Sequence, residues 1–357
     1  MNGRLTRKEF IGGLVAAAGT GCRTSESLVA TPHPSFMWAV LLHFGVNIQC
    51  DIPVDKWGKY RGEDLKLMTA ADHVRFDEDV WRRLTGRMVE KGLNTVVIDL
   101  EEALFYPSHP ELAVKGTWDV GRFRRELARL RSIGLEPIPK LNFSTAHDIW
   151  LKEYHRMVST PTYYRVVTDV IRDVIEIFDT PRLFHIGFDE ETAAHQAKHS
   201  MAIVRQGDLW WHDFLRIVRE IESKGVRAWC WSDRIWKHRD EFLKRMPRSV
   251  LQSNWYYDSE FDVGKISNPV VKRFVEAYDD LERGGFDQVP TGSNWSSPDS
   301  IAGTVRHAKS RIASGRLRGF LAAPWVKTLP QFEKTHEEQI DQLAVARKSF
   351  ARSRPPA

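Results

Sequence analysis

The sequence has little cysteine, and beyond its N-terminus no apolar run reaches membrane-spanning length. The three cysteines among its 357 residues lack CxxC spacing, which excludes the usual zinc and dithiol redox motifs. No GxGxxG or P-loop pattern follows an expected strand, so no motif predicts a metal or a nucleotide cofactor. The 52 Lys and Arg are interleaved with 47 Asp and Glu, which leaves no basic stripe for nucleic acid. Proline-rich linkers are also absent, and we therefore expect one domain with no cofactor and no nucleic-acid partner.

The first 22 residues have the layout of an export signal. Three basic residues precede an apolar stretch that is too short to span a bilayer. Residues 6–11 resemble a twin-arginine signal in which Lys8 stands where the second Arg is expected. Residues 19–22 resemble a loose lipobox that ends at Cys22. We expect residues 1–22 to be a signal peptide, with Cys22 as a lipidation site and the only membrane anchor. The protein would then be periplasmic or a membrane-anchored bacterial lipoprotein; an ordinary exposed N-terminal helix is the alternative.

The rest of the chain repeats one unit, in which an amphipathic helix ends at a glycine and a short apolar run follows. The apolar residues of 80–89 have helical spacing, Gly92 ends that helix, and 95–98 is strand-like. Eight strands are predicted in this way, at 36–44, 95–98, 135–141, 182–187, 226–231, 250–255, 288–292 and 319–325. Buried strands that alternate with helices indicate a parallel sheet of the α/β class. We predict a single (β/α)8 TIM barrel over residues 30–350; a doubly wound open sheet is the alternative.

Proline marks the expected start of several helices. Thr160-Pro161 and Asn268-Pro269 each place a capping side chain directly before a proline at the first helical position. By the same pattern, Ser297-Pro298 is expected to open a helix that continues to Ile312.

The active site of such a barrel is built at the carboxyl ends of its strands, and here these ends carry acids, histidines and aromatic side chains. The polar candidates are Glu101, Glu102, His147, His185, Asp189, Glu190 and Asp233. The aromatic candidates are Trp231, Trp255, Tyr257, Trp295 and Trp325. Tryptophan faces stack on sugar rings and carboxylates bind their hydroxyl groups, so this combination is typical of a carbohydrate site. We expect a carbohydrate partner.

Adjacent acids, Asp189 and Glu190, form the most informative element. Glycosidic cleavage needs a carboxylic acid to protonate the leaving oxygen and a second group to stabilise the transition state. Neighbouring residues of a regular strand point to opposite faces, so the pair can share a site only if Gly187 allows the strand to break. An aromatic pocket and a nearby carboxylate would then favour the protonated form of Glu190. Alternatively, these acids merely stand at the N-terminus of the following helix.

The segment His185-Ile-Gly-Phe-Asp-Glu190 resembles the His-x-Gly-x-Asp-Glu motif of glycoside hydrolase family 20, the exo-β-N-acetylhexosaminidases. The resemblance is closest to the branch that contains hexosaminidase D. Further short motifs agree in the same order, namely residues 137–147, Trp231-Ser232-Asp233, Trp255-Tyr256-Tyr257 and 292–295.

The resemblance implies removal of terminal β-linked hexosamine by substrate-assisted retaining hydrolysis, in which the 2-acetamido oxygen of the substrate attacks the anomeric carbon. It makes Glu190 the general acid/base and Asp189 the group that orients the acetamido nitrogen. Tyr257, rather than Tyr256, would bond the acetamido oxygen. By the same resemblance, Trp231, Trp255 and Trp325 would form the walls, and His147 and His185 would support the acids. Asp233, Trp295, Glu101 and Glu102 complete the expected substrate-binding set.

Four positions depart from the family pattern. The first strand has no Arg, Lys140 stands where the family has Glu, Tyr256 replaces an Asp, and Lys327 follows Trp325 where the family often has an acid. Two other functions therefore stay open. One is a catalytically silent carbohydrate-binding barrel. The other is a metal-dependent barrel hydrolase or isomerase that would use Glu101, His185, Asp189 and Asp233.

Overall fold

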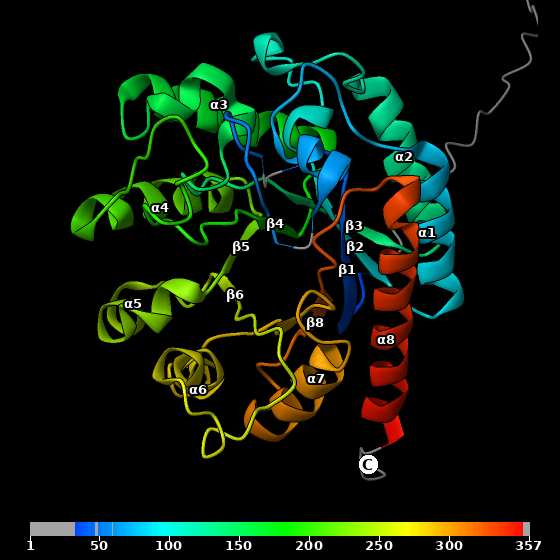
Figure 1. Cartoon of the computed structure of the whole chain (residues 1–357), viewed down its shortest axis with the longest axis vertical. Helices are drawn as coiled ribbons and strands as arrows, with labels where there is room; N and C mark the ends of the chain where they lie inside the picture. Colours follow the sequence, from blue (N-terminus) through cyan, green and yellow to red (C-terminus); the bar gives the residue numbers. More distant parts are fainter. Residues whose placement is uncertain (1–32, 47–48, 59, 353–357) are drawn as a thin grey trace, which may run out of the picture. The chain divides into compact units, whose positions relative to one another are not determined.

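The computed structural model describes residues 33–46, 49–58 and 60–352, and in this part of the chain eight parallel strands form a barrel (Figure 1). The strands are β1 (Met37–His43), β2 (Thr95–Asp99), β3 (Glu136–Lys140), β4 (Leu183–His185), β5 (Arg227–Trp231), β6 (Leu251–Ser253), β7 (Thr291–Gly292) and β8 (Gly319–Ala322). Their order is β6-β5-β4-β3-β2-β1-β8-β7, and parallel bridges at Gln252–Gln288 and Trp255–Thr291 join the two ends. The predicted (β/α)8 barrel is confirmed. The expected signal peptide and Cys22 lie outside the described residues.

Helices surround the strands, and α8 packs beside α7 and α1 (Figure 1). The α-helices are α1 (Glu78–Glu90), α2 (Val120–Ser132), α3 (Pro161–Ile177), α4 (Gly207–Glu222), α5 (Arg239–Arg245), α6 (Pro269–Arg283), α7 (Ser300–Arg311) and α8 (Glu333–Arg352). Short 3-10 helices occupy the connections: η1 (Gly62–Met68), η2 (Glu101–Ala103), η3 (Pro110–Leu112), η4 (Ile149–Arg156), η5 (Asp233–Trp236) and η6 (Pro330–Phe332). Within the described ranges, no helix combines the length and apolarity that crossing a membrane requires.

Two of the three predicted proline-marked starts are confirmed. The Thr160 side chain accepts a hydrogen bond from the Tyr163 N–H, and the Asn268 side chain accepts one from the Val270 N–H. The third prediction is wrong by two residues, because α7 begins at Ser300 and not at Pro298. The Ser297 hydroxyl accepts the Asp299 N–H and closes a local turn ahead of the helix.

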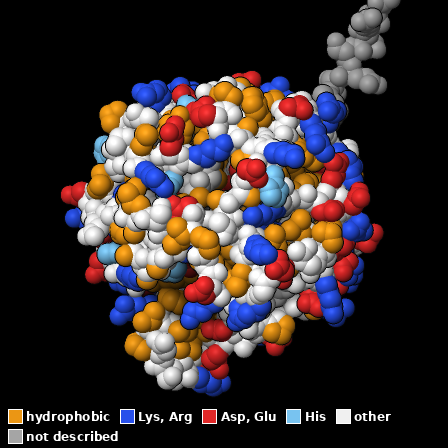
Figure 2. Space-filling model, turned by 45° about the horizontal axis from the view of Figure 1, so that its top comes forward, with side chains coloured by type: hydrophobic (Ala, Val, Ile, Leu, Met, Phe, Trp, Pro, Cys, Tyr) orange, Lys and Arg blue, Asp and Glu red, His pale blue; other side chains and the backbone are white. Residues whose placement is uncertain are grey.

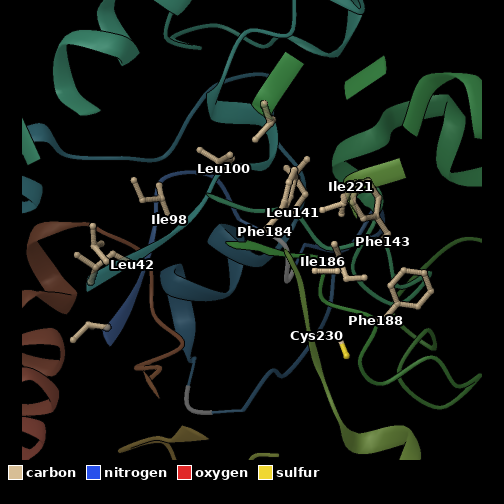
Figure 3. Packing of buried hydrophobic residues seen from close by; sticks show 14 of the residues in the cluster. Leu42, Ile98, Leu100, Leu141, Phe143, Phe184, Ile186, Phe188, Ile221 and Cys230 are labelled. Carbon is tan, nitrogen blue, oxygen red and sulfur yellow. The ribbon is translucent and has the colours of Figure 1, made fainter. Parts of the chain in front are cut away.

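Alternation along each strand divides the core into two layers. Leu42, Ile98 and Phe184 belong to the larger cluster, which lies between the strands and the helices and is seen from close by in Figure 3. Leu41 and Val97, one position earlier, belong to the smaller cluster that fills the barrel. Successive strand residues point to opposite faces, so the next inward position of each strand lies at its carboxyl end.

Those inward end positions form a polar ring across four strands. The strand registers pair His43 with Asp99, Asp99 with Lys140, and Lys140 with His185, and all four side chains are at most 1% exposed. Lys140 Nζ lies 2.8 Å from Asp99 Oδ1, and His43 Nδ1 lies 3.1 Å from Asp99 Oδ2. Burial alone would raise the pKa of Asp99, but the Lys140 charge and the His43 ring hold it below its usual value. Lys140 is thus the counter-charge of this buried acid.

Two prolines inside β3 explain its limited pairing with β4. Glu136 N–H donates to Asn94 O on the β2 side, whereas Leu141 N–H donates to His185 O on the β4 side. The backbone nitrogens of Pro137 and Pro139 face β4, as that of Leu141 does, but proline has no N–H to donate to that strand. Consequently β3 and β4 pair in register only at Lys140 and His185, beside the point where β4 ends.

Candidate active site

The chain turns sharply directly after β4. Gly187, Phe188 and Glu190 all have left-handed backbone angles, with φ of 68°, 70° and 56°. Asn142 anchors this turn, because its Oδ1 accepts the Phe188 N–H at 3.1 Å and its Nδ2 donates to Asp189 Oδ1 at 2.8 Å. The turn allows both acids to face one site, as the glycine predicted. The helix-terminus alternative fails, since α4 begins only at Gly207.

His147 joins the two acids. Its Nε2 lies 3.3 Å from Glu190 Oε2 and 3.5 Å from Asp189 Oδ2. One donor atom from each of the three side chains lies within 4.8 Å of the other two. His147 and Asp189 are buried, at 3% and 7% exposure, whereas the Glu190 side chain is 30% exposed and accessible to a ligand.

The charge state of Glu190 differs from the sequence-based expectation. Burial alone would raise its pKa, but two imidazoles, His147 and His195, outweigh burial and hold the pKa well below its usual value. His195 Nε2 lies 3.3 Å from Glu190 Oε1, and this contact raises the pKa of His195. In the free protein Glu190 is therefore a carboxylate that must receive its proton from solvent or from an imidazolium before it can act as an acid.

Asp233 adds a third carboxyl group. Its Oδ2 accepts the backbone N–H of Glu190 at 3.0 Å. Burial and the nearby Asp189 charge raise its pKa to about 8, so Asp233 is protonated at neutral pH. Its Oδ1 is buried and makes no hydrogen bond within the described part of the chain. This arrangement leaves a carboxyl oxygen for a ligand hydroxyl or amide.

An aromatic wall continues from the acids. The Trp231 and Trp325 ring centroids are 5.8 Å apart, and Trp255 stacks on Tyr257 at 5.0 Å. Trp325 Nε1 donates to the Tyr257 hydroxyl at 2.9 Å, which leaves the hydroxyl proton free to be donated. Burial raises the pKa of Tyr257 well above the usual value, and the charges of Glu190 and Asp189 raise it further. Tyr256 instead donates to Glu260 O at 3.0 Å, so of the two tyrosines it is Tyr257 that contacts Trp325 and Trp255.

Three candidate residues support the site from beneath or beside it. His185 is fully buried, and its Nδ1 accepts the Gly187 N–H at 3.1 Å, which stabilises the turn. Glu101, also fully buried, accepts the Asn142 N–H at 3.1 Å. Glu102 accepts hydrogen bonds from the Val46 N–H and from a Gln49 side chain.

Trp295 lies apart from the aromatic wall. It packs with Cys50, Tyr60 and Met68 in a separate cluster that includes η1. Its indole fills the space against Gly58, where a Cβ would lie 2.2 Å from the ring. Trp295 follows β7 and packs against the connection between β1 and α1, whose irregular sequence gave no indication of this contact.

The four residues of the metal-dependent alternative, Glu101, His185, Asp189 and Asp233, do not form one metal site in the described part of the chain. Glu101 and His185 are engaged below the turn, whereas Asp189 lies above it with His147 and Glu190. Among the described residues, the group whose donor atoms lie close enough for one ion is His147, Asp189 and Glu190.

Two site residues, His195 and Lys198, were missed by the sequence analysis, as was the role of the strand-end residue Asn142 as the anchor of the turn. Lys198 is 6% exposed, and its Nζ lies 3.6 Å from the Trp57 ring centroid. Burial lowers its pKa to about 8, opposed by the charges of Glu190 and Asp189. His195 and Lys198 lie in the irregular segment between Glu190 and α4, where only their closeness in sequence to Glu190 was a signal.

Replacing Gly187 by alanine should destabilise the turn. The new Cβ would lie 2.0 Å from Asn142 Oδ1, which cannot move away without losing the hydrogen bonds it accepts from the Phe188 and Ser144 N–H groups. Together with the cost of positive φ, we expect the free energy of unfolding to fall by about 2–4 kcal/mol in urea titrations. Gly134→Ala is the matched control, because Gly134 has φ of 88° and no atom within 4 Å of an added Cβ. It should cost only about 1 kcal/mol, and equal losses would refute the role of Asn142.

Lys327 is a buried cation that contacts the connection between β1 and α1. It is 1% exposed, and its Nζ lies 3.9 Å from Met68 Sδ. Burial and the Arg75 charge lower its pKa from 10.5 to about 7, while the Glu102 charge opposes this shift. The position where the family often has an acid is thus used here to anchor the connection between β1 and α1.

Lys327→Met should therefore stabilise the protein, most strongly at pH 6. Below pH 7 the native lysine carries a buried charge, and its depressed pKa corresponds to a penalty of about 5 kcal/mol. Between pH 7 and 10.5 the unfolded chain binds more protons than the native state, so wild-type stability rises with pH and the gain from the substitution shrinks. Unfolding titrations at pH 6 and 9 test this. The exposed control Lys224→Met should change little, and a gain independent of pH would contradict the prediction.

Comparison with known proteins gives similarity in structure only. No protein-family model matches the sequence, and no curated protein matches it either. Among solved structures, an exo-β-N-acetylglucosaminidase of glycoside hydrolase family 20 from Vibrio harveyi aligns with 12% identity and a TM-score of 0.55, over 89% of this chain and 58% of that chain. A β-N-acetylhexosaminidase from Bacteroides fragilis aligns with 13% identity and a TM-score of 0.55, over 85% of this chain and 66% of that one.

Dispersin B aligns with 16% identity and a TM-score of 0.51, over 76% of this chain and 95% of that chain. The chain thus spans little more than half of the Vibrio enzyme and nearly all of Dispersin B. The resemblance found in the short motifs is confirmed at the level of the fold: the barrel of this chain is similar to the barrels of family 20 hexosaminidases.

Proposed function

We propose that the protein is a glycoside hydrolase that removes terminal β-linked N-acetylhexosamine by an exo-acting, substrate-assisted retaining mechanism. The observation that carries the proposal is the turn after β4. It directs Asp189 and Glu190 into one site. The charges of both acids act on Tyr257, whose hydroxyl accepts a hydrogen bond from Trp325. The similarity of the barrel to those of family 20 hexosaminidases supports the same reaction class.

In the proposed reaction, Glu190 protonates the glycosidic oxygen, for which its 30% exposure gives access. The acetamido oxygen of the substrate attacks the anomeric carbon as the glycosidic bond breaks. Asp189, held by Asn142, accepts the acetamido N–H and stabilises the positive charge that develops on that group. The Tyr257 hydroxyl, whose own proton is not used in the contact with Trp325, donates a hydrogen bond to the acetamido oxygen and orients that oxygen toward the anomeric carbon. Water, deprotonated by Glu190, then opens the cyclic intermediate with net retention.

The chain's own imidazoles supply the proton that Glu190 needs. His147 and His195 both contact its carboxylate, and the raised pKa of His195 keeps this ring protonated to higher pH. When the uncharged leaving oxygen approaches Glu190, transfer of a proton from an imidazolium to the carboxylate gives the acid form. Asp233, protonated at neutral pH, holds the backbone of Glu190 without adding a further negative charge.

Turnover of aryl N-acetyl-β-glucosaminide and galactosaminide by the purified protein tests the proposal, and NMR of the first-formed sugar anomer tests retention. Hydrolysis that survives EDTA and yields the β-anomer first is the expected result. Sugar binding without turnover would favour a silent carbohydrate-binding barrel. Turnover abolished by EDTA would favour a metal-dependent enzyme.

We also propose that residues 1–22 direct export and that Cys22 carries a lipid. The basic residues, the apolar stretch and the final cysteine support this proposal. Labelled palmitate should enter the wild-type protein in bacterial cells and not Cys22→Ser. Equal labelling of both proteins, or labelling of neither, would refute the lipid anchor.

A further inference from the structure

The contacts of His147 are unusual for a buried histidine. Its side chain is 3% exposed, yet neither ring nitrogen makes a hydrogen bond within the described part of the chain. Its Nε2 is aimed between two carboxylates, at 3.3 Å from Glu190 Oε2 and 3.5 Å from Asp189 Oδ2. A buried imidazole that is close to two acids but aligned with neither lacks the geometry of an ordinary histidine–carboxylate pair.

These spacings match the edges of a metal coordination polyhedron. Zinc binds imidazole nitrogen and carboxylate oxygen at about 2.0–2.2 Å, and in a tetrahedron this places neighbouring ligand atoms about 3.3–3.6 Å apart. The two distances from His147 Nε2 lie at this spacing, and the donor atoms of all three side chains lie within 4.8 Å of one another. One nitrogen and two carboxylate oxygens favour zinc over magnesium, which prefers six oxygen ligands.

We propose that His147, Asp189 and Glu190 form a zinc-binding site that overlaps the catalytic acids. Three protein ligands leave the fourth position open to water. Zinc and substrate exclude each other there, because a metal-bound Glu190 cannot protonate a glycosidic oxygen and a metal-bound Asp189 cannot orient an acetamide. Zinc binding at this site does not depend on the proposed function. Inhibition of hydrolysis by zinc does rest on the proposed function, because it requires that the protein be a hydrolase.

Two neighbours shape this site from outside. His195 approaches the other oxygen of Glu190, at 3.3 Å, so it supports the ligand without belonging to the set of three. The Lys198 ammonium acts on both carboxylates and opposes a second cation. Removing this charge should strengthen zinc binding, whereas removing a ligand should weaken it. These opposite changes in zinc affinity distinguish a specific metal site from general attraction of the cation to acidic side chains.

Calorimetric titration of the purified full-length protein with zinc tests the proposal, in a Cys22→Ser background so that this thiol does not compete. We expect one zinc per chain, and affinity at least about tenfold weaker in His147→Gln and in Asp189→Asn. Lys198→Met should bind zinc more tightly than the parent, and the exposed control His238→Gln should match the parent. Magnesium should not compete at equal concentration. Circular dichroism confirms that each variant is folded.

Absence of zinc binding, or equal affinity in the parent, His147→Gln and Asp189→Asn, would overturn the proposal. Thermal unfolding gives a second readout, since a ligand of the native state raises the Tm of the parent and not of the ligand variants. If zinc binds as expected but aryl hexosaminides are not hydrolysed, the proposed function fails and the metal site stands. If hydrolysis is observed but zinc neither binds nor inhibits, the metal site alone fails.

Discussion

Replacing Glu190 by glutamine is expected to lower kcat/KM for an unactivated N-acetyl-β-hexosaminide by about 10²–10⁴-fold, because the glutamine amide cannot protonate the leaving oxygen. Glutamine keeps the size of the side chain and the left-handed backbone position of residue 190. The loss should depend on the leaving group. An aglycone that departs as a stable anion needs little protonation, so a dinitrophenyl glycoside should be affected far less than a disaccharide. Steady-state kinetics with both substrates measure this difference.

Glu153→Gln is the matched control, since it makes the same chemical change on an exposed part of η4. It should leave kcat/KM unchanged. A Glu190→Gln variant that loses the same factor with both leaving groups would contradict a role as general acid. Such a result would instead indicate a binding or structural role for this side chain.

Replacing Asp189 by asparagine is expected to lower kcat by about 10²–10³-fold, because the neutral amide cannot stabilise the positive charge that develops on the attacking acetamide. The Asp189 carboxylate is positioned by the 2.8 Å hydrogen bond from Asn142 and by the turn that this residue anchors. Wild-type turnover should also fall steeply when the acetamide is fluorinated, because fluorine withdraws electrons from the attacking oxygen. The ratio of rates for acetamido and trifluoroacetamido substrates measures this sensitivity.

Asp240→Asn, which changes a carboxylate that is 92% exposed on α5, serves as the control and should leave both rates unchanged. If wild-type turnover were insensitive to fluorination, the acetamide would not be the nucleophile. The mechanism would then require a protein carboxylate in that role, and Asp189 would be the first candidate.

The barrel was predictable because the polarity of the side chains shows where the chain has the repeat of a helix and where it has the short apolar run of a buried strand. Helical spacing that ends at a glycine located α1, and the apolar run after it located β2. Gly187 indicated the break after β4, since few residues tolerate positive φ beside a close contact such as Asn142.

The ionisation of Glu190 was not predictable from the same signals. Its charge depends on His147 together with His195, and His195 reaches the carboxylate from an irregular segment with no periodicity to place it. Burial of Lys327 against Met68 depends likewise on the irregular connection before α1. Local patterns predict regular elements and their ends, whereas contacts between two irregular segments arise only from the folded chain.

The departures from the family pattern acquire physical roles in the structure. Lys140 neutralises Asp99 inside the barrel, and His43 of the first strand completes that buried group. Tyr256 is turned toward Glu260, away from the acids. Lys140, His43 and Tyr256 do not take the place of Glu190 or Asp189. The proposed chemistry therefore depends on the turn after β4.

Dependence of turnover on the 2-acetamido group is the most discriminating measurement for substrate-assisted hydrolysis by this protein. The purified protein should be given 4-nitrophenyl N-acetyl-β-glucosaminide and 4-nitrophenyl β-glucoside, which differ only in that substituent. We expect nitrophenol release from the acetamido sugar and kcat/KM at least about 10³-fold lower for the 2-hydroxy sugar, which lacks both the nucleophile and the partner of Asp189. Comparable turnover of the two glucose-derived substrates would contradict substrate-assisted hydrolysis. So would the absence of turnover with these two substrates and with the corresponding galactosaminide.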